Sequence, residues 1–255
     1  MTTIKKVENC IIINLDDRQD LWQSLTQFRE LWTKLDKQYI RIPGINYKNN
    51  VNVINDFIIK NRISLNGSGF RKNKKSFLGE LGCYMAHFNA WNYVVENKLE
   101  TCLILEDNIE LLRTDFMNLH IEENLDILFI NEEMKYMHNQ FIGYGTQGYV
   151  VTNTGAMNLI EKCYTLNCPI DLHMRHMCNI KELTANITIE PFVKRSSDKL
   201  SSIGYDFNIK NFNINEFEID NLNVDDPNLK QDQNNILSRL LTNLIKQNVN
   251  LDNYI

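Results

Sequence analysis

The 255-residue sequence lacks a hydrophobic run long enough to cross a bilayer, and it has no excess of positive charge. Its formal net charge of -5 argues against a general nucleic-acid binder. The first apolar run ends at Asn14; it is too short for a signal-peptide core, and no small-residue cleavage site follows it. We therefore expect a cytoplasmic protein without a membrane span. The heavy use of Asn, Ile and Lys is what AT-rich coding would give, as in some bacteria and large DNA viruses, and a viral protein made in host cytoplasm fits it.

Cysteine pairs at metal-binding or redox spacing are also missing. The six cysteines are scattered, none forms a CxxC pair, and several lie inside apolar runs; they are Cys10, Cys83, Cys102, Cys163, Cys168 and Cys178. This distribution predicts buried reduced thiols and excludes a disulfide framework.

What the sequence does have is an alternation of strand and helix signals, which is typical of an α/β domain with a mostly parallel sheet. With 43% hydrophobic residues, the chain can bury a sizeable core. The predicted strands span residues 10–15, 38–42, 102–106, 127–130, 148–152 and 183–189. The predicted helices span residues 16–37, 51–60 and 80–97, with a further helix that Asn153 caps. Residues 66–76 are basic and contain two glycines, so we expect a loop there.

The composition changes after about residue 205. An Asn-rich acidic stretch is followed by a helical apolar pattern between residues 229 and 246. We therefore predict a domain over residues 1–204 and a C-terminal extension over 205–255, an ordered wrap or linker and then an amphipathic helix. The helix could dock on the domain or pair with another copy to form a homodimer.

A cluster of oxygen-bearing side chains follows the strand predicted over residues 102–106. The apolar run ends in Glu106, Asp107 and Asn108, and open α/β sheets bind ligands at the carboxyl ends of their strands. Oxygen ligands suit a hard divalent cation, which can neutralise a diphosphate. The sequence therefore indicates an enzyme acting on a phosphorylated donor, although a solvated turn would use similar residues.

Several segments, in this order, make the sequence resemble glycosyltransferase family 25, which includes lipooligosaccharide and collagen hydroxylysine galactosyltransferases. The matching segments are IINLDDR, RIPGIN, GELGCYMAHFNAW, LILEDNIEL, GYVVTNTGAMNLI, PID and PFVKRSSDKLSSI, which together span about four-fifths of the chain. The resemblance implies a GT-A-like fold, a nucleotide-sugar donor and a divalent cation such as Mn²⁺. Two positions depart from the family pattern: Asn108 replaces an acidic residue, and Ala86 replaces a serine before His87.

The resemblance also implies roles for individual residues. The metal would be held by Glu106, Asp107 and Asn108, and the donor would be contacted by Asn14, Arg18, Lys75, Glu80, His87, Glu106 and Asp107. Asp171 is the candidate base that takes the acceptor hydroxyl's proton, and Glu80 is a second candidate catalytic residue.

Each of these residues also has a structural interpretation. Asn14 and Arg18 could lie at an exposed helix start, Lys75 in a solvated loop, and His87 in the core. Asp171 could cap a helix, and Glu132 and Glu133 compete with it as the base. His173, His176 and Cys178 do not have the spacing of a standard zinc site, so we interpret them as ordinary helix residues.

We therefore expect an inverting transferase that moves galactose or glucose from a UDP-sugar to a hydroxyl of a glycan or collagen-like hydroxylysine. One alternative is a catalytically weak member that binds a nucleotide-sugar or glycan, which Asn108 and Ala86 motivate. Another is an interaction subunit that acts through its C-terminal helix.

Overall fold

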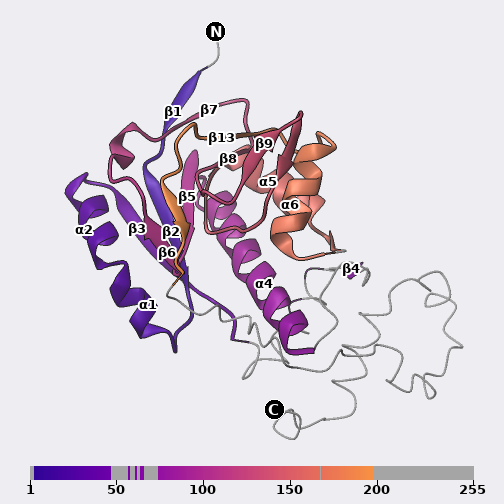
Figure 1. Cartoon of the computed structure of the whole chain (residues 1–255), viewed down its shortest axis with the longest axis horizontal. Helices are drawn as coiled ribbons and strands as arrows, with labels where there is room; N and C mark the ends of the chain where they lie inside the picture. The colour runs from indigo at the N-terminus through magenta and orange to yellow at the C-terminus, as the bar shows by residue number, and fades with distance from the viewer. Residues whose placement is uncertain are drawn as a thin grey trace, which may run out of the picture.

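The computed structural model describes residues 3–46, 57, 61, 64–65, 74–166 and 168–197. A six-stranded sheet forms its centre, in the order β13-β8-β11-β5-β2-β3 (Figure 1). The strands are β2 (Asn9–Asn14), β3 (Gln38–Pro43), β5 (Thr101–Glu106), β8 (Ile127–Phe129), β11 (Gly148–Thr152) and β13 (Ala185–Ile187). Within it, β2 is parallel to β3 and β5, and β13 is parallel to β8, whereas β11 is antiparallel to both of its neighbours. The mostly parallel sheet predicted from the sequence is confirmed.

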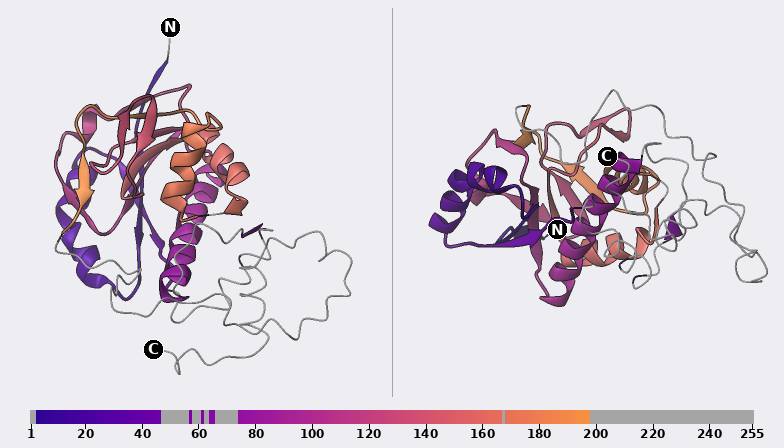
Figure 2. Two further views of the ribbon diagram at one scale, coloured as in Figure 1. Left: turned by 45° about the vertical axis from the view of Figure 1, so that its right-hand side comes forward. Right: turned by 90° about the horizontal axis from the view of Figure 1, so that it is seen from below.

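Helices cover both faces of this sheet (Figure 2). On one side lie α1 (Gln19–Ser24) and α2 (Thr26–Lys34); on the other lie α4 (Lys74–Glu96), α5 (Asn153–Lys162) and α6 (Ile170–Asn179). Each face buries its own apolar cluster, one centred on α4 and the other on Phe28 and Trp32 of α2. Because β2, β5 and β11 are buried on both faces, their apolar runs are continuous rather than alternating.

Short antiparallel ribbons surround the sheet. They are β1 (Ile4–Lys6) with β7 (His120–Glu122), β9 (Lys135–Met137) with β10 (Gln140–Ile142), and β6 (Ile109–Leu111) with β14 (Val193–Arg195). A parallel pair joins β4 (Ser64–Leu65) to β12 (Thr165–Leu166), and a 3₁₀ turn, η2, spans Phe116–Asn118. No helix in the described ranges has the length and apolar character needed to span a bilayer.

The predicted helix over residues 16–37 is wrong in its length and continuity. It begins at Gln19 and is divided at Leu25 into α1 and α2. The hydroxyls of Ser24 and Thr26 donate to the carbonyls of Leu21 and Gln23, each at 2.7 Å. Such side-chain bonds compete with the regular helical ladder, which explains the interruption.

The cap of α5 is also corrected. Thr152, not Asn153, is the N-cap: its hydroxyl accepts a hydrogen bond from the Gly155 N–H at 2.9 Å. The Asn153 amide instead donates to the carbonyls of Val94 and Leu99, at 3.1 and 3.2 Å. Asn153 therefore ties the start of α5 to the end of α4.

The end of the predicted basic loop is helical, because α4 begins at Lys74. Residues 66–73 of that loop and the extension over 205–255 lie outside the described residues, as does nearly all of the predicted helix over 51–60. The structure therefore leaves these three predictions untested.

Candidate functional site

Three of the predicted site residues, Asn14, Glu106 and Asp107, meet at one edge of the sheet. Because β2 and β5 are parallel neighbours with Ile13 opposite Glu106, Asn14 and Asp107 emerge side by side. The Asn14 amide donates to Oδ2 of Asp107 at 2.7 Å, and its oxygen accepts from Nε of Arg41 at 2.9 Å. Asn14 is almost completely buried, so these bonds fix the orientation of its amide.

Burial changes the ionisation of Asp107. The pKa of this carboxyl is raised to about 6, chiefly by burial and also by the charge of Glu106, although the hydrogen bond from Asn14 and the charge of Arg18 lower it. Asp107 can therefore change its charge near neutral pH, unlike an exposed aspartate.

Glu106 faces the opposite way, toward α4. Its Oε1 atom lies 3.3 Å from Nε2 of His87 and accepts a hydrogen bond from the Thr146 hydroxyl at 2.5 Å. Burial acts to raise the pKa of Glu106, but the contacts with His87 and Thr146 and the charge of Arg195 outweigh it and hold the pKa below its usual value. This carboxylate is therefore kept ionised.

A buried chain of hydrogen bonds fixes the His87 ring. The Trp91 indole N–H donates to the Tyr149 hydroxyl at 2.8 Å, and that hydroxyl lies 2.9 Å from Nδ1 of His87. If Tyr149 donates its only hydrogen to Nδ1, the ring N–H lies at Nε2 and points at Glu106. His87 is thus both a core residue and a contact of the strand-end carboxylate.

Asp171 lies in the first turn of α6 and holds the loop that precedes β11. Its Oδ2 atom accepts from the Gly145 N–H at 2.8 Å, and its Oδ1 atom accepts from the Leu172 N–H at 2.9 Å. Gly143 and Gly145 have positive φ angles of 99° and 94°, which glycine adopts without strain. The same loop brings Thr146 onto Glu106.

Helix α4 adds Glu80, Cys83 and His87. Glu80 is buried, and Cys83 is half-buried. Burial raises the pKa of the Cys83 thiol, and so do the charges of Glu106, Asp171 and Glu80, while a hydrogen bond with Thr146 opposes the rise. All three acids are therefore close enough to act on one thiol.

The remaining predicted residues lie in different settings. Arg18 is bound to Asp20 through two hydrogen bonds of 3.0 Å, and Lys75 lies within α4, with its side chain outside the described residues. Asn108 has a buried side-chain oxygen that accepts no hydrogen bond in the structure. Glu132 is exposed, and one oxygen of Glu133 accepts from the Arg195 N–H at 2.7 Å.

One convergent group was not predicted. Of the described residues, the set of three or more His, Cys, Asp or Glu side chains with converging ligand atoms is Cys83, His87 and Glu106, whose atoms lie within 4.8 Å of one another. The four-residue spacing of Cys83 and His87 on one helix was the available signal. Thr146, Tyr149 and Trp91 were also missed as contacts of the site, and no spacing rule could have found Thr146.

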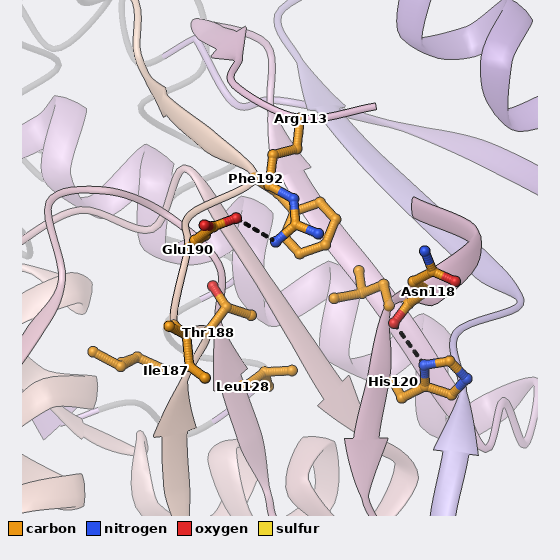
Figure 3. A pocket seen from close by; sticks show the side chains of 10 residues that line it. Arg113, Asn118, His120, Leu128, Ile187, Thr188, Glu190 and Phe192 are labelled. Atoms are coloured by element: carbon orange, nitrogen blue, oxygen red, sulfur yellow. Dashed lines mark hydrogen bonds and ion pairs between the residues drawn. The ribbon is translucent and has the colours of Figure 1, made fainter. Parts of the chain in front are cut away.

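A separate pocket of about 490 Å³ is lined in part by Leu128 of β8 and Ile187 of β13 (Figure 3). Arg113 lies 3.6 Å from a carboxylate oxygen of Glu190 and 4.3 Å above the Phe192 ring. The pocket lining contains none of the predicted site residues; it consists of Arg113, Asn118, Leu119, His120, Leu128, Ile187, Thr188, Ile189, Glu190 and Phe192.

The α/β sheet with polar and acidic side chains at its strand ends fits a Rossmann-like protein, a class that binds ligands at the carboxyl ends of its strands. The model of glycosyltransferase family 25 (LPS biosynthesis protein) matches residues 7–142, which is more than half of the chain. The chain therefore belongs to glycosyltransferase family 25, as the ordered motifs predict, and its class of enzyme is that of the family, a glycosyltransferase. The match ends before β11 and α6, so it does not include Asp171.

Two relatives are procollagen galactosyltransferases. Procollagen galactosyltransferase 1 of Danio rerio is 27% identical over 104 residues, which cover 32% of this chain and 17% of that protein. Procollagen galactosyltransferase 2 of Homo sapiens is 25% identical over 105 residues, which cover 32% of this chain and 16% of that protein. The chain thus matches only a small part of the length of these relatives.

Proposed function

We propose that this chain transfers a hexose, galactose or glucose, from a UDP-sugar to a hydroxyl of a glycan or a collagen-like acceptor, with inversion at the anomeric carbon. The observation that most favours this function is the pairing of buried Asp107 with Asn14 beside Glu106, at the carboxyl ends of β2 and β5. A GT-A-like arrangement, with the donor across these strand ends, accounts for that position.

The side chains at this edge fit a divalent cation such as Mn²⁺. Asp107 and Asn108 offer hard oxygen donors, and the Asn108 oxygen is buried without accepting a hydrogen bond, which would be costly without another partner. Asp107, Asn108 and Glu106 would hold the cation. When bound, it supplies charge neutralisation for the leaving diphosphate.

The rest of the proposed donor site consists of Asn14, Arg18, Lys75, Glu80 and His87. Asn14 orients Asp107 through a hydrogen bond of 2.7 Å, and His87 orients Glu106 through a contact of 3.3 Å. Arg18 offers a guanidinium suited to a phosphate or a pyrimidine edge, and Lys75 a further positive charge. Glu80, buried on α4, would accept a hydrogen bond from a donor hydroxyl.

We assign Asp171 as the base. In an inverting transfer the acceptor oxygen attacks the anomeric carbon, its proton passes to a carboxylate, and the nucleotide leaves. The charges of Asp171 and Glu106 both raise the pKa of the Cys83 thiol, which favours a position of Asp171 near the strand-end carboxylates. The competing candidates are Glu132, which is exposed, and Glu133, which accepts a hydrogen bond from the Arg195 N–H.

Titration calorimetry with UDP-galactose and UDP-glucose, with and without Mn²⁺, tests the donor and the cation. In Asp107→Ala the Mn²⁺-dependent part of donor affinity should disappear, whereas Glu161→Ala, an exposed carboxylate on α5, should bind as wild type. Unchanged Mn²⁺ dependence in Asp107→Ala would remove Asp107 from the site.

The proposed role of Asp171 as the general base is tested with a separate substitution. Asp171→Asn should retain donor binding and lose transfer by on the order of 10²–10⁴-fold, as expected for a missing general base. Because Asp171 also holds Gly145, thermal melting should be measured in parallel. Transfer near the wild-type rate would move the search for the base to Glu132 and Glu133.

A second candidate function is binding of a nucleotide-sugar or glycan with little transfer. Asn108 favours it, because an amide brings no negative charge to the cation. Donor hydrolysis separates the two functions: a binding protein should bind the UDP-sugar and release no UDP.

A further inference from the structure

The middle of α4 and the end of β5 bring three metal-ligating side chains together. Cys83 and His87 are four residues apart on α4 and therefore lie on one side of the helix. Glu106 reaches them from β5, and the sulfur, ring nitrogen and carboxylate oxygen all lie within 4.8 Å of one another. We propose that Cys83, His87 and Glu106 form a binding site for a zinc-class divalent cation.

The spacing of the atoms fits such an ion. Nε2 of His87 and Oε1 of Glu106 are 3.3 Å apart. Two ligands about 2.0–2.1 Å from a tetrahedral Zn²⁺ are separated by about 3.3 Å, and a thiolate at about 2.3 Å lies about 3.5 Å from either. The Cys83 sulfur lies within 4.8 Å of both atoms and therefore needs to move by little more than about 1 Å to reach that separation.

The ligand types distinguish this site from the proposed Mn²⁺ site. A thiolate and an imidazole favour zinc-class ions, whereas Mn²⁺ and Mg²⁺ prefer oxygen ligands such as Asp107 and Asn108. Three protein ligands leave a fourth coordination position for water, as in catalytic zinc sites. Cys83 and Glu106 are each only partly buried, so the group does not lie wholly within the core.

The surroundings also orient the imidazole. Tyr149 lies 2.9 Å from Nδ1 of His87 and is itself held by Trp91, so Nε2 stays directed at Glu106. On binding, the thiol proton passes to solvent, Nε2 gives its lone pair to the ion, and the ring proton resides on Nδ1. The Tyr149 oxygen has two lone pairs and can accept from both Nδ1 and Trp91.

The two sites share Glu106. Glu106 already contacts His87, and an ion held by Cys83 and His87 would keep this carboxylate there and withhold it from the strand-end oxygen cluster. If the proposed transfer function is correct, zinc-class ions inhibit the transferase and removal of the thiol relieves the inhibition. The site itself does not depend on that function.

Cobalt is a suitable probe because Co²⁺ bound to a thiolate has a charge-transfer band in the near ultraviolet. Metal-free, full-length protein is titrated with Co²⁺ in the absence of nucleotide. We expect one equivalent to give this band in the wild type, and Zn²⁺ to displace it. Cys83→Ser should lose the band and bind Co²⁺ at least about 100-fold more weakly. Even substitution of a residue that only hydrogen-bonds to a metal ligand lowers metal affinity 10–100-fold.

Cys168→Ser is the matched control. Cys168 is also half-buried, and the charges of Asp171 and Glu80 also raise the pKa of its thiol. It does not belong to the group formed by Cys83, His87 and Glu106. It should retain the band. A wild type without the band, a Cys83→Ser variant that retains it, or a Cys168→Ser variant that loses it would each overturn the site.

A measurement on the wild type keeps the proposal testable if Cys83→Ser does not fold. Zn²⁺ should slow alkylation of Cys83 at least tenfold and leave alkylation of Cys168 unchanged, as followed by peptide mass spectrometry. Equal rates at Cys83 with and without Zn²⁺ would overturn the site. Because no donor is present, a failure of the proposed transfer function would leave both readouts unaffected.

Discussion

Asp107 is the residue where burial has the clearest chemical effect. Its carboxyl is buried beside another acid, and its pKa is raised from an ordinary value of 3.8 to about 6. A carboxyl whose pKa is higher in the folded state favours folding while it is protonated. That contribution is complete below about pH 4 and is lost as the pH rises through about 6.

Replacing Asp107 with Asn should therefore change how stability depends on pH. Relative to wild type, Asp107→Asn should gain about 3 kcal/mol of unfolding free energy between pH 4 and pH 7, since a pKa difference of about 2 corresponds to that energy. The amide can still accept the bond from Asn14. Urea denaturation of metal-free protein at several pH values measures the difference. A constant difference across this range would mean that Asp107 titrates normally.

At this scale the sequence predicted the residues better than their contacts. The run ending in Glu106, Asp107 and Asn108 placed three side chains at a strand end. It did not predict that Glu106 faces His87 while Asp107 faces Asn14. Nor did it predict Thr146, because its contact with Glu106 depends on the fold of a loop 40 residues away.

Among the elements, α4 depends most on a close approach to its neighbours. Its described side chains are buried on nearly all sides, and Gly82 lies against the chain that follows β3. A Cβ atom at Gly82 would lie 2.5 Å from the carbonyl oxygen of Ile45. Since that atom belongs to the backbone, it cannot move aside cheaply.

Gly82→Ala should therefore destabilise the protein by about 1–3 kcal/mol, although alanine favours helices by about 1 kcal/mol over glycine. Glu96→Ala, an exposed change on the same helix, is the control and should have little effect. Thermal and denaturant unfolding of both variants tests this. A more stable Gly82→Ala variant would show that α4 can move away from Ile45.

Helices and strands were predictable from the sequence where a single pattern, such as a continuous apolar run, determined them. Continuous apolar runs gave β2, β5 and β11 to within one residue. The direction of β11 was not predictable, because a buried apolar run reads the same for a parallel and an antiparallel strand. The division of α1 from α2 was missed because it depends on side-chain bonds to the backbone.

For the whole molecule, the apolar clusters on the two faces of the sheet provide the stability. Their buried members come from positions between Val7 and Val193. The proposed boundary at residue 204 therefore lies beyond the described core.

We expect a chain shortened to residues 1–204 to fold and to melt within a few degrees of the full-length protein. A chain ending at residue 182 loses β13 and β14, and with them Val193 and Phe192 of the second cluster, so it should not melt cooperatively. Calorimetry of the three chains tests the boundary. If the 1–204 chain fails to fold, the domain does not end at residue 204.

The reversed direction of β11 has a consequence for divergence within the family. A parallel strand brings the residues that follow it to the ligand edge, whereas β11 brings those that precede it, the loop with Gly145 and Thr146. Insertions or deletions between β8 and β11, around the β9–β10 hairpin, would reshape that edge while the pairing of Gly148 with Leu105 stays in register. Evolution can thus vary this wall of the site by changing loop length alone, without rebuilding the sheet.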